Sequence, residues 1–234
     1  PLLDNVTINQ NSASRGAGLS VQERSNPEIK NTIISNNQID NTGSGLWGGG
    51  VCIESHSNPT FENVQITGNT AYTGGGVYIN NQCSPTFENV QITGNTANSG
   101  GGGIYANNTD LTLTNSLIRG NSVTDPDNTG QRKDGGGVYA DNSTLFFQDV
   151  TIDSNQVESD PFNDHGGGIF IQGGSNSIFD NLTVADNSAG HGAGISIGGG
   201  VSASFINSSI INNAGHSMLE NKIQDKLIEI TNKL

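Results

Sequence analysis

The chain has 234 residues, with 33 glycines, few aromatic residues and a formal net charge of −13 at pH 7. Nucleic acid is not expected as a partner, because a polyanion binds surfaces rich in Lys and Arg and this chain would repel one. No apolar stretch reaches the roughly 18 residues of a membrane-spanning helix, so no transmembrane segment is predicted.

One sequence motif recurs eight times along the chain. The residues from Pro59 to Ala71 return unchanged from Pro85 to Ala97, 26 residues later. Each copy contains an asparagine, and successive asparagines are separated by 26 residues or by 26 plus an insertion. These asparagines are Asn11, Asn37, Asn69, Asn95, Asn121, Asn155, Asn187 and Asn213. A fixed period of this kind indicates one structural unit stacked on itself.

Each repeat predicts three short strands separated by three corners. A polar residue stands six positions before each asparagine, a large apolar residue stands two positions earlier, and a glycine run ends the repeat at another apolar residue. The polar column is Asn5, Asn31, Asn63, Asn89, Asn115, Asp149, Asn181 and Asn207. Apolar residues alternate with polar ones, which is the period of a strand with one buried face.

Stacking is what allows such short strands to form a core. Strands of a few residues cannot enclose a core alone, but coils stacked at about 4.8 Å bury a continuous one. Asparagine tolerates the left-handed conformation of a tight corner, and its amide can bond the amide of the next coil. We therefore expect one all-β domain over residues 1–217, with Asn69 and Asn95 on adjacent coils.

The repeat resembles the right-handed parallel β-helix superfamily, which has the pectate-lyase-like fold. The segments from Ile66 to Ala71 and from Gly74 to Val77 are similar to the FxxN and GGAI repeats of polymorphic outer-membrane proteins and related bacterial surface proteins. They differ in having Ile in place of Phe and a third glycine in place of Ala. The resemblance covers residues 1–216 and implies a right-handed single-stranded parallel β-helix of about eight coils. Lyases, hydrolases, epimerases, adhesins and stalks share this fold, so it leaves the activity open.

A candidate glycan-binding face follows the glycine runs. If Val77 points inward, its neighbours in the strand point outward. The candidate residues are the rings Tyr78, Tyr105, Tyr139 and Phe170 and the polar residues Asn80, Asn107, Asp141 and Gln172, beside the glycines Gly50, Gly76, Gly103, Gly137 and Gly168. We expect a shallow groove in which rings meet the C–H faces of a polysaccharide and amides bond its hydroxyls. Alternatively, the rings only stabilise neighbouring strands. In families with the pectate-lyase fold, this strand borders the substrate cleft.

Insertions lengthen the connection between the asparagine and the glycine run, and two of them lie on neighbouring coils. They bring together six carboxylates, which are Asp125, Asp127, Asp134, Glu158, Asp160 and Asp164. Ca²⁺ prefers six to eight oxygen ligands, so these residues form a candidate Ca²⁺ site. The alternative is a set of solvated loop charges.

His165 and His191 occupy one column, four residues before the apolar end of their glycine runs. Two stacked imidazoles could share a metal ion, although a corner histidine more often bonds the backbone. A lyase needs a strong base and a hydrolase needs two suitably spaced carboxylates. The only basic residues expected near this face are Arg132 and Lys133, so no catalytic residue is assigned and enzymatic activity stays open.

Cys52 and Cys83 are the only cysteines. They occupy different columns of the repeat and are expected to be too far apart for a disulfide. We therefore predict two free thiols.

Residues 218–234 contain no glycine and predict an amphipathic helix. The apolar stripe consists of Leu219, Ile223, Leu227, Ile230 and Leu234. Such a helix could cover the open end of the coil stack, whose unpaired strand edges need protection. The alternative is a short coiled coil that joins chains into an oligomer.

These features favour a bacterial extracellular or cell-surface protein with a structural or adhesive role, which presents its face to a glycan or another partner. One alternative is a polysaccharide lyase or glycoside hydrolase acting on a surface polysaccharide. Another is a self-assembling filament subunit. The chain begins at Pro1 in mid-repeat with no visible signal peptide, which is typical of a processed protein or a piece of a longer one.

Overall fold

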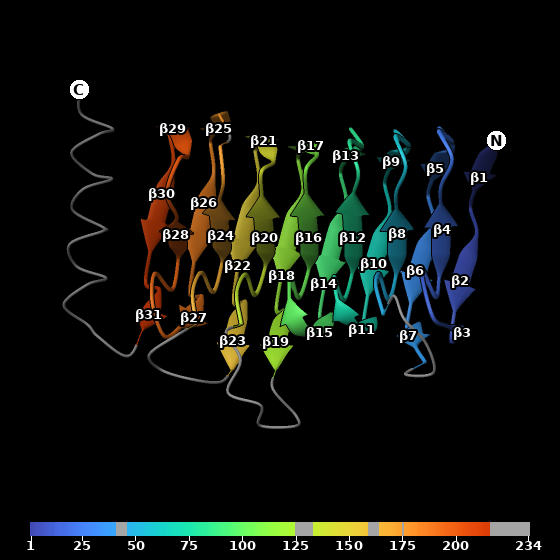
Figure 1. Cartoon of the computed structure of the whole chain (residues 1–234), viewed down its shortest axis with the longest axis horizontal. Coiled ribbons are helices and arrows are strands. Elements are labelled where there is room, and N and C mark those ends of the chain that lie inside the picture. Colours follow the sequence, from blue (N-terminus) through green and yellow to red (C-terminus); the bar gives the residue numbers. More distant parts are fainter. Residues whose placement is uncertain (41–45, 125–132, 159–163, 175, 216–234) are drawn as a thin grey trace.

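The structure is a computed structural model and describes residues 1–40, 46–124, 133–158, 164–174 and 176–215. In this part the chain winds as a coil, and its turns lie side by side along the long axis (Figure 1). The strands form four parallel sheets, which we name A to D in the order in which the chain reaches them. Sheets A, B and C have eight strands each and sheet D has seven, so the predicted parallel β-helix of about eight coils is confirmed.

Sheets A and B hold the first two strands of each coil. Sheet A contains β1 (Leu2–Asp4), β5 (Glu28–Lys30), β9 (Thr60–Glu62), β13 (Thr86–Glu88), β17 (Asp110–Thr114), β21 (Thr144–Gln148), β25 (Asn176–Asp180) and β29 (Ser202–Ile206). Sheet B contains β2 (Thr7–Asn9), β6 (Ile33–Ser35), β10 (Gln65–Thr67), β14 (Gln91–Thr93), β18 (Leu117–Arg119), β22 (Thr151–Asp153), β26 (Thr183–Ala185) and β30 (Ser209–Ile211).

Sheets C and D complete the coil. Sheet C contains β3 (Ser12–Ala13), β7 (Gln38–Ile39), β11 (Thr70–Thr73), β15 (Thr96–Gly100), β19 (Ser122–Thr124), β23 (Gln156–Glu158), β27 (Ser188–Ala189) and β31 (Ala214–Gly215). Sheet D contains β4 (Leu19–Val21), β8 (Val51–Ile53), β12 (Val77–Asn80), β16 (Ile104–Asn107), β20 (Val138–Asp141), β24 (Ile169–Gln172) and β28 (Ile195–Ile197).

The prediction of three strands per repeat is wrong, because a full coil has four. The additional strand belongs to sheet C and directly follows the asparagine column. It is only two residues long in β3 and β7, and in β11 and β15 it turns the small residues Ala71 and Ala97 inward. A strand this short with a small apolar residue has the sequence of a corner, which is why the periodicity did not reveal it.

The hydrophobic core is continuous along the coil axis. Alternate residues of each strand point inward, so identical columns of the repeat stack on one another. Phe61 and Phe87 show this packing, with ring centroids 4.6 Å apart and planes 4° from parallel. Both rings are fully buried, as are the inward isoleucines of sheet B such as Ile66 and Ile92. A repeat of one length therefore produces one uninterrupted core.

The two polar columns occupy different corners. The column from Asn5 to Asn207 lies between sheets A and B, is exposed, and has φ angles between 49° and 57°. These left-handed values are the ones that Asn adopts with least strain. The column that includes Asn69 and Asn95 lies between sheets B and C and is fully buried in the inner coils.

The predicted C-terminal helix over residues 218–234 lies outside the described residues, so its role as a cap or oligomerisation segment stays a prediction. Nowhere in the described ranges is there a helix long and apolar enough to cross a membrane.

Candidate functional site

Aromatic rings on the outer side of sheet D stack into a ladder. Tyr78, Tyr105, Tyr139 and Phe170 are paired residue to residue on neighbouring strands. Their ring centroids are 5.3, 4.6 and 5.4 Å apart in succession, and the first two pairs lie within 6° of parallel. Parallel strands in register place one column at the strand spacing, which suits ring stacking. The predicted ladder is thus present.

The rings are less accessible than an open sugar-binding platform requires. Tyr78 is 5% exposed and Phe170 is 2% exposed, while Tyr105 and Tyr139 are partly exposed. Each inner ring has a neighbour on both faces, so its faces are covered and its edge and hydroxyl are what remain for solvent. This geometry corrects the expectation that sugar C–H groups meet the flat faces. Binding through hydroxyls and amides stays a prediction.

The glycines beside the ladder also differ from the expectation of a bare outer strip. A Cβ on Gly76 would lie 2.6 Å from the Gly103 carbonyl oxygen and 3.0 Å from Nδ2 of Asn95. The glycine is therefore packed against the next coil and the buried asparagine column. Strand alternation does not extend to this position, because the chain turns at Gly74, whose φ is +66°.

Trp47 extends the ladder at its N-terminal side. The Trp47 ring stacks on Tyr78, with centroids 5.2 Å apart and planes at 10°. The Arg15 guanidinium lies 4.8 Å from the Trp47 ring centroid, and its Nη1 is 3.1 Å from Oε2 of Glu54. Sequence reasoning missed this residue because it borders an insertion and its counterparts on the neighbouring coils, Arg15 and Thr73, are not aromatic. Its only signal was that it is the one tryptophan of the chain.

Two histidines lie at the other end of the ladder. The imidazoles of His165 and His191 stack with centroids 5.1 Å apart, so their predicted shared column is confirmed. The His165 ring is 6.0 Å from that of Phe170, and its Nδ1 lies 3.2 Å from Oδ1 of Asp134. His165 therefore has a carboxylate partner beside the ring ladder. Whether these histidines bind a metal stays a prediction.

The proposed Ca²⁺ ligands fall into two groups. Asp125, Asp127 and Asp160 lie outside the described residues. Asp134 and Asp164 are buried, and Oδ1 of Asp164 accepts a hydrogen bond of 2.8 Å from the Lys133 backbone N–H. Glu158 is exposed at the end of β23. Within the described ranges, no three His, Cys, Asp or Glu side chains are grouped to hold a metal ion. The Ca²⁺ site thus stays a prediction that depends largely on residues 125–132 and 159–163.

The polar row consists of Asn80, Asn107, Asp141 and Gln172, which end successive strands of sheet D. They are paired residue to residue and are partly exposed. Asn80 Nδ2 donates to the Tyr78 hydroxyl at 3.0 Å, and Gln172 Nε2 donates to the Tyr139 hydroxyl on the preceding coil, also at 3.0 Å. The polar row and the ring hydroxyls therefore form one hydrogen-bonding surface across four coils.

Burial favours the uncharged form of two tyrosines of this surface, Tyr78 and Tyr105. Desolvation raises the pKa of Tyr78 to about 12. Desolvation also raises the pKa of Tyr105, and the nearby Asp141 carboxylate adds to that effect. A neutral phenol both donates and accepts hydrogen bonds. The polar row therefore combines neutral amides with the single carboxylate of Asp141, beside neutral phenols.

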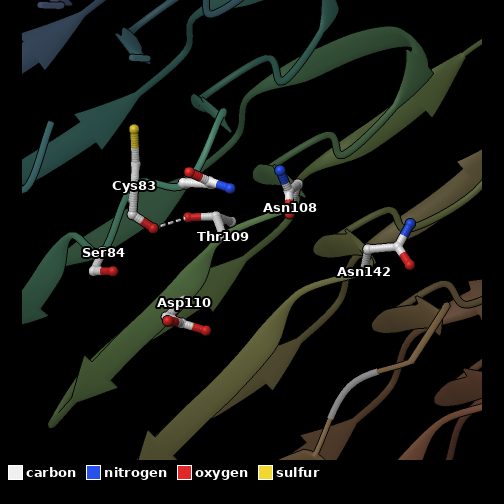
Figure 2. A pocket seen from close by; sticks show the side chains of 7 residues that line it. Cys83, Ser84, Asn108, Thr109, Asp110 and Asn142 are labelled. Carbon is white, nitrogen blue, oxygen red and sulfur yellow. Dashed lines mark hydrogen bonds between the residues drawn. The ribbon is translucent and has the colours of Figure 1, made fainter. Parts of the chain in front are cut away.

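A polar hollow adjoins the row where the chain turns from sheet D to sheet A (Figure 2). Its volume is about 150 Å³, and it is lined by Gln82, Cys83, Ser84, Asn108, Thr109, Asp110 and Asn142. A second hollow of about 320 Å³ shares Gln82 and Asn108 with the first. Sequence reasoning missed both. The available signal was the number of residues from Asn80 to Phe87, which exceeds by one the number from Asn107 to Leu113.

Comparison with known proteins identifies the fold of the chain. The family model described as the right handed beta helix region matches residues 1–144 and residues 49–222. Among curated proteins, none matches the sequence.

Proposed function

Because the chain belongs to the right-handed β-helix family, we propose that it is an extracellular structural or adhesive rod that holds a surface glycan against sheet D. Its coils are fixed to one another by continuous backbone pairing and by a common core. Stacked repeats of this kind form extended and stiff binding surfaces. Such a rod suits a protein that presents one long face to a partner.

The polar row is the observation that carries this proposal. Asn80, Asn107, Asp141 and Gln172 repeat at the spacing of parallel strands, about 4.8 Å, and none is fully buried. A glycan is an extended chain that also presents hydroxyls at regular intervals. Side-chain amides donate and accept hydrogen bonds, so they match hydroxyls of either polarity. The ring edges and phenol hydroxyls border the same surface.

Charge narrows the class of glycan. The formal net charge of −13 disfavours long acidic polysaccharides, because like charges repel. The polar row itself contains one carboxylate and no Lys or Arg. We therefore propose a neutral glycan.

A glycan array probed with and without Ca²⁺ tests this function. We expect binding to neutral polysaccharides that does not require added Ca²⁺. The bound glycan should then be searched for new reducing ends and unsaturated products. Such products would favour the alternative of a lyase or hydrolase, with Asp134 and His165 as the first residues to substitute. The absence of binding to any glycan on the array would contradict the proposal.

End-to-end assembly is a second candidate function. In β28, the last strand of sheet D, Ile197 is 47% exposed, although Ile171, its partner on the preceding strand of the sheet, is fully buried. Apolar side chains at an end of a coil stack favour contact with another surface. Light scattering of the chain with and without residues 218–234 tests this candidate. An unchanged monomer mass in both samples would contradict it.

A further inference from the structure

The corner between sheets D and A changes its construction midway along the rod. Asn80 pairs with Asn107 on the next coil, and Phe87 pairs with Leu113. Six residues separate the first and last of these positions in one coil, but only five in the next. The difference lies in the turn itself. Two left-handed residues, Asn81 and Gln82, are followed one coil later by the single left-handed residue Asn108.

This loss of one residue divides these corners into longer and shorter ones. The earlier coils turn with the left-handed pairs Glu23–Arg24, Ser55–His56 and Asn81–Gln82, whereas the next two coils turn with Asn108 and Asn142 alone. The two hollows lie where the longer corners meet the shorter ones. Figure 2 shows residues of three successive coils around the smaller hollow.

The floor of the smaller hollow is closed and its hydrogen bonds are satisfied. Cys83 and Thr109 are buried there, and the Thr109 hydroxyl donates to the Cys83 carbonyl oxygen (Figure 2). The Cys83 thiol lies 3.0 Å from the Asn80 carbonyl oxygen, which it can reach as a donor. The floor therefore supplies shape, and the rim supplies the groups that can meet a ligand.

The rim carries polar side chains that are not engaged with the protein. Gln82, Ser84, Asn108 and Asp110 are exposed, and within the described ranges none of their side chains makes a hydrogen bond. Amides at the corner between sheets A and B behave differently. There Asn89 Nδ2 donates to Oδ1 of Asn63 at 2.6 Å. Where the corner has the same length in every coil, exposed amides of neighbouring coils bond one another. Where the corner loses one residue, four polar side chains surround one hollow without bonding one another.

The chemistry of the rim fits a sugar. Two amides, one hydroxyl and one carboxylate offer both donors and acceptors, as sugar hydroxyls require. No Lys or Arg lines either hollow, so neither favours an anion. A volume of about 150 Å³ is half the lower bound of about 300 Å³ for pockets that take drug-sized ligands. The smaller hollow thus has room for one sugar ring and not for a longer chain.

The hollow lies beside the end of the polar row. Asn108 directly follows Asn107, and Gln82 lies two residues after Asn80. We propose that the smaller hollow binds one uncharged sugar ring, which is the terminal or branch residue of the glycan held by the polar row. This inference rests on the proposed function and gives the glycan a defined end point.

The test is an NMR titration of the full chain with the methyl glycosides of glucose, galactose, mannose and N-acetylglucosamine. We expect at least one of them to shift the side-chain amide signals of Gln82 and Asn108. The Asn108→Gly variant removes the amide and keeps a residue that accepts a φ of +51°. Its affinity for that sugar should fall about fivefold, which corresponds to one net hydrogen bond.

The matched control is Asn115→Gly. Asn115 is exposed and has a φ of +50°, but it lies at the corner between sheets A and B, away from the hollow. We expect it to bind the sugar as the unmodified chain does. Asp110→Asn, which keeps the shape of the carboxylate, should also weaken binding. Absence of shifts with all four glycosides, or equal losses in the two glycine variants, would overturn the proposal.

This result is separable from the proposed function. If polysaccharides bind on the array and Asn108→Gly binds them as tightly as the unmodified chain, the sugar-ring site is wrong and the polar row remains supported. If nothing binds on the array, the proposed function itself fails.

Discussion

Asn69 Nδ2 lies 2.9 Å from Oδ1 of Asn95 on the next coil, and both side chains are fully buried. The same Oδ1 accepts the Asn69 backbone N–H at 2.9 Å. Asn95 Nδ2 in turn donates to Asn121 Oδ1 and to the Ile66 carbonyl oxygen. Each buried amide therefore uses its donors and its acceptor fully, with one Nδ2 bond to the next asparagine on the C-terminal side and one to a backbone carbonyl on the preceding coil. This asparagine ladder fixes how one coil sits on the next.

Asn95→Ala should strongly destabilise the protein. The substitution leaves two Asn69 donors without the Asn95 acceptor, inside a region closed to water. Each buried polar group without a partner costs about 1–3 kcal/mol, so we expect a loss of about 3 kcal/mol in the free energy of unfolding. Urea denaturation followed by circular dichroism measures it.

The control for this variant is Asn89→Gly. Asn89 belongs to the exposed polar column and has a φ of +52°, which glycine accepts. Its side chain makes one exposed hydrogen bond, to Asn63, so the expected loss is about 0.5 kcal/mol. Equal losses in the two variants would show that burial of the ladder does not matter.

Gly76→Ala should destabilise by steric overlap. The added Cβ would lie 2.6 Å from the Gly103 carbonyl oxygen, which belongs to the backbone of the next coil and cannot move alone. We expect a cost of about 3 kcal/mol, as for other overpacked sites. Gly94→Ala is the contrast, because nothing lies within 4 Å of its Cβ and only its φ of +63° is unfavourable. There the cost should be about 1 kcal/mol.

Thermal unfolding of both alanine variants compares the two effects. A lower melting temperature for Gly94→Ala than for Gly76→Ala would contradict the close approach of adjacent coils at the glycine runs.

The stacking of the coils was predictable because the repeat spacing is regular. Asn69 and Asn95 are 26 residues apart within identical segments, so equal coil lengths had to place one above the other. The inward columns followed from strand alternation, which Phe61 and Phe87 obey. The strands of sheet C were not predictable in this way. They are only two to five residues long, and a segment as short as the one around Ala71 lacks a distinctive period.

The sequence predicted which residues of the candidate site share a column, but not how their side chains are arranged. Sequence alternation placed Tyr78 outward, but it carries no information on the direction of the ring along the stack or on the partners that cover it. Trp47 joins the ladder from a column whose neighbouring members, Arg15 and Thr73, are not aromatic. The shorter turn at Asn108 is recognised by counting the residues between two paired columns. That comparison becomes meaningful once the paired residues are known.

Tyr78 should make stability depend on pH in the alkaline range. Its pKa is raised by burial from 10.0 to about 12, so the folded state favours the neutral phenol. This contribution is present below pH 10 and is lost as the pH rises from 10 toward 12, because the unfolded chain releases the proton first. Urea denaturation at pH 9 and pH 11 should show a smaller decrease in stability for Tyr78→Phe than for the unmodified chain. An identical decrease would contradict the burial of the Tyr78 side chain.

Both thiols should be unreactive in the folded protein. Cys52 and Cys83 are fully buried and unbridged, and burial raises the pKa of each thiol. Thiol reagents attack the thiolate, whose population falls as the pKa rises. Ellman's reagent should therefore detect no thiol in the native protein and both in guanidinium chloride. Rapid reaction of either cysteine under native conditions would contradict this packing.

The most direct test of the central claim compares two double variants on the neutral polysaccharide that gives the strongest array signal. Asn80→Ala with Asn107→Ala removes two amides from the polar row. Thr67→Ala with Thr93→Ala changes two hydroxyls on sheet B, where Thr93 bonds Thr67 at 3.1 Å. In calorimetric titrations we expect the first pair to lower affinity about tenfold and the second to leave it unchanged. Binding that survives loss of the two amides, or falls equally in both variants, would contradict a glycan-binding role for sheet D.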